Sequence, residues 1–192
     1  MKTTLKGLCF LLLAAVFMLS GCSSIQTGQS ERDQMFTAKI DGKEIYFGMP
    51  VEEMSESFTM IEDRNKGLKV YDGFSALIRI GDTMCSVRID LDEAGGAEIQ
   101  DIKKAKKFIK IDAETTKADI IEIFGEPVAE FENNMQYAYR YEDLKLEKSE
   151  LPTSQMDKDE LYDHYLLSFR MAEDGKAESV MMCDGHAAVY VN

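Results

Sequence analysis

Cys85, Cys183, Asp184 and His186 carry the side chains of this sequence that are best suited to chemistry. Thiolate, carboxylate and imidazole groups bind zinc or copper, and two thiols can also form a disulfide. However, Asp184 opens what reads as an ordinary turn, and Cys85 alternates with Val87 as a buried strand residue would. The sequence therefore predicts no metal site. It leaves a Cys85–Cys183 disulfide open beside two buried thiols, and it keeps metal binding or redox sensing by Cys183, His186 and Cys85 as a second functional hypothesis.

Motifs of the common hydrolases and nucleotide-binding enzymes are missing from the sequence. It contains no Gly-x-Ser-x-Gly, no phosphate-binding loop and no His-Glu-x-x-His. Its histidines are His164 and His186, and a cysteine two or three residues from a histidine says nothing about their geometry. We therefore expect a protein that is not an enzyme and that holds no cofactor.

Aromatic residues suggest a surface for binding another protein. Tyr137, Tyr139 and Tyr141 alternate along one predicted strand, so that all three lie on one side of it, and Tyr71 and Phe74 occupy the corresponding earlier region. One interpretation is a sheet face packed against its helix. The other is an exposed aromatic face that contacts a partner, with these five residues as its candidates.

The first residues have the pattern of a secretory signal peptide. Lys2 and Lys6 precede an uncharged, mostly apolar run from Leu8 to Leu19, and small residues follow. The run is shorter than the about 20 apolar residues that a membrane-spanning helix needs. Residues 1–21 are therefore predicted to be a signal peptide, and the polar residues 22–34 a flexible tether.

The segment Leu19-Ser20-Gly21-Cys22 resembles the bacterial lipobox. The resemblance implies cleavage after Gly21 and a diacylglyceryl group on the sulfur of Cys22, and two acyl chains are enough for stable anchoring. It predicts an extracytoplasmic lipoprotein held at the cell membrane, or at an outer membrane where the host has one. Its formal net charge of −13 disfavours nucleic acid as a partner.

Two stretches of the sequence have the same organisation. A helix is predicted from Pro50 to Phe58, and a second one ends at Phe124 after Thr116 and Asp119, which have capping-box spacing. Alternating residues then predict one hairpin from 87–91 and 97–102, and another from 167–171 and 177–182. We therefore expect an α+β fold of two tandem units, each a short helical element on an antiparallel β-meander, at residues 35–107 and 108–192. The second unit has an acidic insertion near residues 142–163.

These motifs resemble a superfamily of small lipoproteins. Gly48-Met49-Pro50-Val51-Glu52-Glu53-Met54 and the segment from Thr115 through Phe124-Gly125-Glu126-Pro127 are similar to those of the outer-membrane assembly lipoproteins (SmpA/OmlA) and the β-lactamase inhibitory protein. Pro50 replaces the usual Thr, and the first copy has no Gly-x-Pro. The resemblance implies a non-catalytic module that binds another envelope protein.

Overall fold

The computed structural model describes residues 36–64, 67–79, 81–102, 107–143, 145–185 and 187. Cys22, the predicted signal peptide and tether, and His186 lie outside the described residues. Within the described ranges, no helix is both long enough and apolar enough to cross a membrane.

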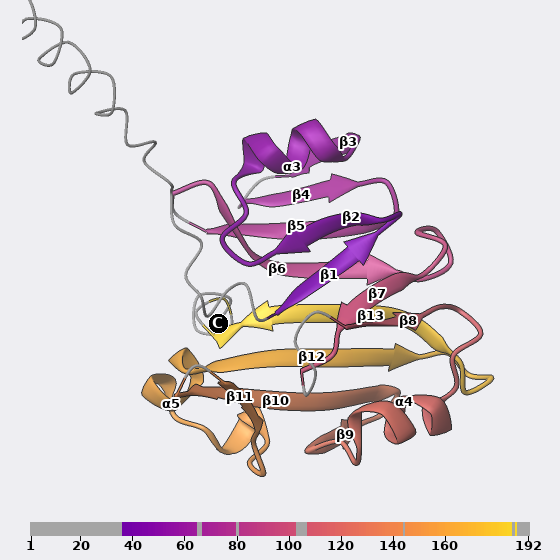
Figure 1. Cartoon of the computed structure of the whole chain (residues 1–192), viewed down its shortest axis with the longest axis vertical. Coiled ribbons are helices and arrows are strands. Elements are labelled where there is room, and N and C mark those ends of the chain that lie inside the picture. Colours follow the sequence, from indigo (N-terminus) through magenta and orange to yellow (C-terminus); the bar gives the residue numbers. More distant parts are fainter. Residues whose placement is uncertain are drawn as a thin grey trace, which may run out of the picture.

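Most of the described chain forms two antiparallel sheets (Figure 1). The smaller one has four strands in the order β2 (Lys43–Tyr46), β1 (Thr37–Ile40), β7 (Ala97–Gln100) and β8 (Phe108–Ile111). The larger one has nine strands in the order β11 (Lys145–Lys148), β10 (Asn134–Glu142), β12 (His164–Met171), β13 (Ala177–Asp184), β6 (Thr83–Asp90), β5 (Phe74–Arg79), β4 (Leu68–Tyr71) and β3 (Met60–Arg64), with β9 (Ala129–Phe131) beside β10.

Short helices complete an α+β fold. They are α3 (Val51–Ser57), α4 (Lys117–Phe124), the 3-10 turn η1 (Thr153–Gln155) and α5 (Lys158–Tyr162). The predicted capping box of α4 is confirmed: the Thr116 hydroxyl accepts from the Asp119 amide, and the Asp119 carboxylate accepts from the Thr116 amide. In the acidic insertion, Asp157 and Glu160 form a second capping box at the start of α5.

The core lies between the two sheets. Phe36 and Phe47, which flank the first hairpin, stack on Tyr165 of β12 with ring centroids 5.3 and 5.2 Å apart. Met54 of α3 and Ile120 of α4 are fully buried in the same cluster. One face of the nine-stranded sheet, which we call the inner face, is therefore covered by the smaller sheet, α3 and α4 (Figure 1).

Of the two predicted hairpins, the first is wrong and the second is confirmed. Residues 97–100 do not return beside 87–91: β6 lies in the large sheet, whereas β7 pairs with β1 and β8 in the small one. Alternation shows which strand faces are apolar but not which strands pair. After Gly95-Gly96 the chain can either return beside β6 or cross to the small sheet, and it crosses. The β12–β13 hairpin is present. A further hairpin joins β1 to β2, and its Asp41 and Gly42 both have the positive φ of a type I′ turn.

Candidate functional site: the outer face of the large sheet

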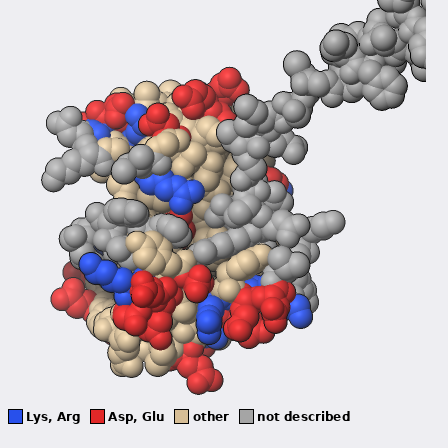
Figure 2. Space-filling view, turned by 90° about the vertical axis from the view of Figure 1, so that its left-hand side faces the viewer, with Lys and Arg blue, Asp and Glu red and all other residues tan. Residues whose placement is uncertain are grey.

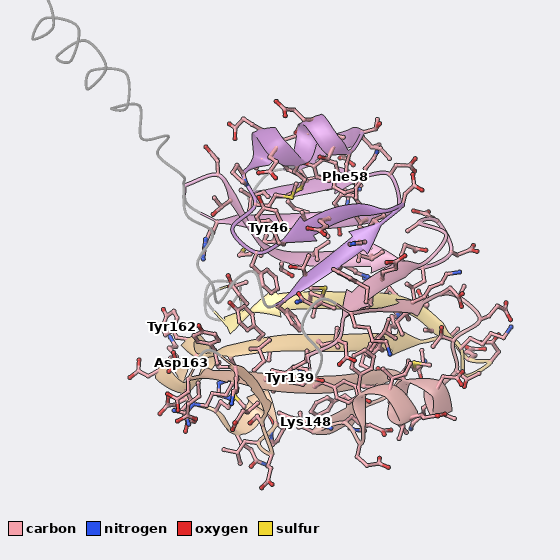
Figure 3. All side chains as sticks on the ribbon, in the orientation of Figure 1. Tyr46, Phe58, Tyr139, Lys148, Tyr162 and Asp163 are labelled. Carbon is pink, nitrogen blue, oxygen red and sulfur yellow. The ribbon has the colours of Figure 1, made fainter. Side chains whose placement is uncertain are left out.

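The tyrosines predicted as partner contacts lie in the core, so the prediction of an exposed aromatic face is wrong. Tyr137, Tyr139, Tyr71 and Phe74 are buried, and Tyr141 is half-buried against the same cluster. Figure 3 shows Tyr139 on the side of the large sheet that faces the small one, where its ring is 6.2 Å from that of Phe36. Burial raises the pKa of Tyr139 well above its ordinary value. The physical reason is that these rings share the inner face with the aliphatic core.

The opposite face, which we call the outer face, is open along its centre. Its central row crosses the sheet through directly paired residues, which are Val70, Ser75, Arg88, Met181, Ser168 and Gln136. Arg88 and Met181 are exposed, and the others are partly exposed. Met181 is 37% exposed although β13 has strands on both sides, so the described elements leave this part of the outer face uncovered.

Arginines collect on the outer face. Strand alternation places Arg64, Arg88, Arg140 and Arg170 there, because their cross-strand partners all belong to that face. Three of them are paired with acids on the same strand or its neighbour: Arg64 with Glu62, Arg140 with Glu142, and Arg170 with Glu178.

Arg88 differs from the other three arginines. Its Nε donates to the Ser179 hydroxyl at 3.3 Å, and among the described residues no carboxylate lies within ion-pair distance of it. The nearest acid on its own strand, Asp90, is occupied in accepting from the backbone amides of Asp92 and Glu93. The Arg88 guanidinium therefore retains donors that can bind a carboxylate from another molecule.

The outer face has two hollows, one that includes part of the central row and one beside the acidic insertion. The first, of about 240 Å³, is lined by Arg64, Val70, Ser75 and Arg88 among others. The second, of about 330 Å³, lies under the acidic insertion and is lined by residues that include Arg140, His164, Met156 and Asp159. His164 is buried, and its Nδ1 lies 2.6 Å from the Glu160 carbonyl oxygen. The outer face thus offers concave polar sites beside an exposed methionine.

Acidic side chains cluster toward the two ends of the molecule. Figure 2 shows them at the top and at the bottom of the side that lies on the left in Figure 1, with basic and uncharged side chains between them. The bottom group includes the insertion, where Asp157, Asp159 and Glu160 are exposed. Among the described residues, no group of three or more metal-ligating side chains forms.

The structure brings Cys85 and Cys183 into one small cluster, together with Ala138, Leu166 and Ala187. The prediction that Cys85 shares a face with Val87 is wrong. Leu77 pairs with Ser86 and Ile78 with Met84, so Cys85 is the extra residue of a β-bulge. The bulge reverses the direction of its side chain, which packs with Leu77 and Cys183 instead of the inner core. Both cysteines are buried thiols in the structure.

A partly buried ion pair lies next to Cys85. Arg79 Nη1 is 3.3 Å from Asp184 Oδ2, and Asp184, which is only 2% exposed, also accepts from the Ala187 amide at 2.8 Å. Burial, followed by the negative charge of Asp184, raises the pKa of the Cys85 thiol to about 11. Cys85 is therefore a neutral thiol at physiological pH and a poor nucleophile in the closed fold.

Sequence reasoning missed Arg88 and Met181. The available signal was alternation: Arg88 lies between Val87 and Ile89, and Met181 between Val180 and Met182, so both had to point away from the core. Compared with known proteins, the chain matches no family model, no curated protein and no solved structure.

Proposed function

We propose that this chain is an exported lipoprotein, anchored through Cys22, that binds another protein of the cell envelope with its outer face and without catalysis. The observation that carries the proposal is the pair of exposed neighbours at the centre of that face, Arg88 and Met181. Arginine and methionine are enriched at protein interfaces, and contacts near the centre of an interface contribute most of the affinity.

The inner face is already used to hold the fold together. Phe58 packs on Phe74 and Tyr71, with its ring 4.9 Å from that of Phe74, and Phe124 packs on Phe169 at 5.3 Å. A partner could reach those rings only if α3 or α4 left the sheet. The outer face needs no such opening, because its central side chains are already in contact with solvent.

The tandem organisation belongs to the same proposal. Phe58 contacts Tyr71 in the first half, and Phe124 contacts Tyr137 in the second, with equal separations along the sequence. Each helix thus ends in a phenylalanine that lies over a tyrosine of the large sheet. This correspondence supports the resemblance to the SmpA/OmlA and β-lactamase inhibitory protein superfamily, whose members bind proteins.

Site-specific crosslinking in the native cell tests the proposal. A photoreactive amino acid is placed at Met181 or, as the control, at Glu52, which is exposed on α3 on the opposite side of the large sheet. We expect a discrete protein adduct from position 181 and none from position 52. Adducts of equal yield at both positions, or none at 181, would contradict the proposal.

The captured partner is then used to measure affinity. Arg88→Ala should weaken binding about 30-fold, which corresponds to about 2 kcal/mol, whereas truncating an exposed ion-paired arginine should have little effect. Arg170→Ala is the matched control, because the Arg170 side chain lines neither hollow, is paired with Glu178 and is 51% exposed. Equal losses for the two variants would show that general charge, and not the centre of the outer face, determines binding.

A further inference from the structure

We propose that Cys85 and Cys183 are partners in a cross-strand disulfide that ties β6 to β13. The inference is independent of the proposed function, since it concerns only the fold. It begins from the bulge at Cys85, without which the two side chains would lie on opposite faces of the sheet.

Register places the two residues at bridging distance. Cys183 pairs directly with Ser86, the residue that follows Cys85. Paired Cα atoms of an antiparallel ladder are about 5 Å apart and successive residues rise about 3.4 Å, so the diagonal Cα pair is separated by roughly 6 Å. Disulfides span Cα separations of about 4.4–6.8 Å. The register thus places the two residues one position apart on neighbouring strands, and the bond requires rotation of both side chains.

The surroundings of both sulfurs are compatible with this rotation. Cys85 Sγ donates to the Leu77 carbonyl at 3.3 Å, and Cys183 Sγ donates to the Asp184 carbonyl at 3.2 Å. These are weak hydrogen bonds, and the remaining members of the cluster are small or apolar side chains: Ala138, Leu166 and Ala187, with Leu77, Val128 and Met156 beside them.

The reaction is a thiol–disulfide exchange. The two thiols lose two protons and two electrons, one S–S bond forms between Cys85 and Cys183, and a disulfide oxidant is reduced to two thiols. Since Cys85 is buried with a raised pKa, the exchange takes place while the chain folds, before β6 and β13 enclose the sulfurs.

The location gives the bond a structural consequence. The β6–β13 pairing joins the two halves of the large sheet: β3, β4, β5 and β6 lie on one side of it, and β13, β12, β10 and β11 on the other. A disulfide there closes a long loop, and disulfides that close long loops constrain the unfolded chain strongly. We expect it to raise the melting temperature by on the order of 10 °C.

Refolding tests the inference. The full chain is extracted from whole cells in urea with reductant, purified in that state, and refolded in oxidised and reduced glutathione or in reductant alone. Cleavage after lysine and arginine leaves Cys85 in a peptide of residues 80–88 and Cys183 in a peptide of residues 177–192. We expect these two peptides joined, and a higher melting temperature for the oxidised sample.

Single variants provide the controls. Cys85→Ala and Cys183→Ala should each abolish the linked peptide and the dependence of melting temperature on glutathione. If the refolded parent carries only glutathione adducts, unmodified thiols, or links to Cys9 or Cys22, the inference is overturned. Since neither a partner nor a membrane enters the assay, failure here leaves the proposed binding function unaffected, and the reverse also holds.

Discussion

Tyr139 lies at the centre of the aromatic packing between the two sheets. It is 4% exposed, and Phe36 packs against it from the small sheet. Replacing Tyr139 with Ala should therefore lower the free energy of unfolding by about 3–5 kcal/mol, through lost burial and the cavity that remains. Urea denaturation measures this loss. Phe131→Ala is the control, because that ring is 52% exposed and its removal should change stability by less than about 0.5 kcal/mol.

Gly185 is fixed by close packing at the end of β13. A Cβ added there would overlap the Leu161 carbonyl oxygen and would approach the His164 carbonyl oxygen within 2.9 Å. Gly185→Ala should therefore cost more than about 2 kcal/mol, because backbone and not a flexible side chain must move. Gly175→Asn is the matched control: its turn has open space around the Cβ position, and asparagine tolerates positive φ. Thermal unfolding of both variants measures the difference.

The stability of the N-terminal cap of helix α4 should depend on pH. Hydrogen bonds from the Thr116 side chain and backbone lower the pKa of Asp119 below its ordinary value. A group whose pKa is lower in the folded state stabilises the fold above its unfolded pKa, about 3.9, and loses that contribution as the pH falls through the folded value. The Asp119 contribution should therefore be fully present at neutral pH and decrease progressively as the pH falls below about 4.

Asp119→Asn checks this expectation. The melting temperatures of the parent and the variant are compared between neutral pH and about pH 3. The parent should be the more stable at neutral pH, and the two curves should converge as Asp119 becomes protonated. A constant difference across that range would show that the carboxylate charge does not support the α4 cap.

The helices and the hairpins closed by short turns could be predicted from the sequence, because their signals are local. The Thr116–Asp119 cap and the Asp41-Gly42 turn each depend on neighbouring residues. The pairing of β13 with β6 depends on residues far apart in the chain, and no local pattern encodes it. The sheet face toward which Cys85 points could not be predicted either. One extra residue in a strand reverses the face of every position beyond it, and the sequence does not show where such a bulge lies.

The candidate site was missed for a related reason. The sequence prediction relied on alternating aromatic residues. In the structure these large side chains fill the core at the inner face. Arg88 and Met181 stand alone between apolar neighbours, and they become adjacent only after β6 and β13 pair. A surface that is assembled from single residues on separate strands has no signature within any one strand.

At the scale of the whole molecule, the anchor at Cys22 remains a prediction. Cys22→Ala should prevent lipid attachment and leave the precursor uncleaved, because the cysteine is the residue that the lipobox resemblance assigns to modification. Mass spectrometry of the membrane fraction measures both changes. Cys9→Ala is the control, and it should have no effect on either. An unmodified N-terminus at a residue other than Cys22 in the parent protein would contradict the prediction.

The last strand that the structure describes occupies the middle of the large sheet. β13 (Ala177–Asp184) lies between β12 and β6 and is the only link between the strands on either side in the observed strand order. Pairing across so large a sequence separation is slow to form. Until β13 has been synthesised, β12 and β6 each have an unpaired edge in their half of the large sheet. A chain that stops before residue 177 would hold two separate partial sheets, each with an open strand edge that can pair with another molecule.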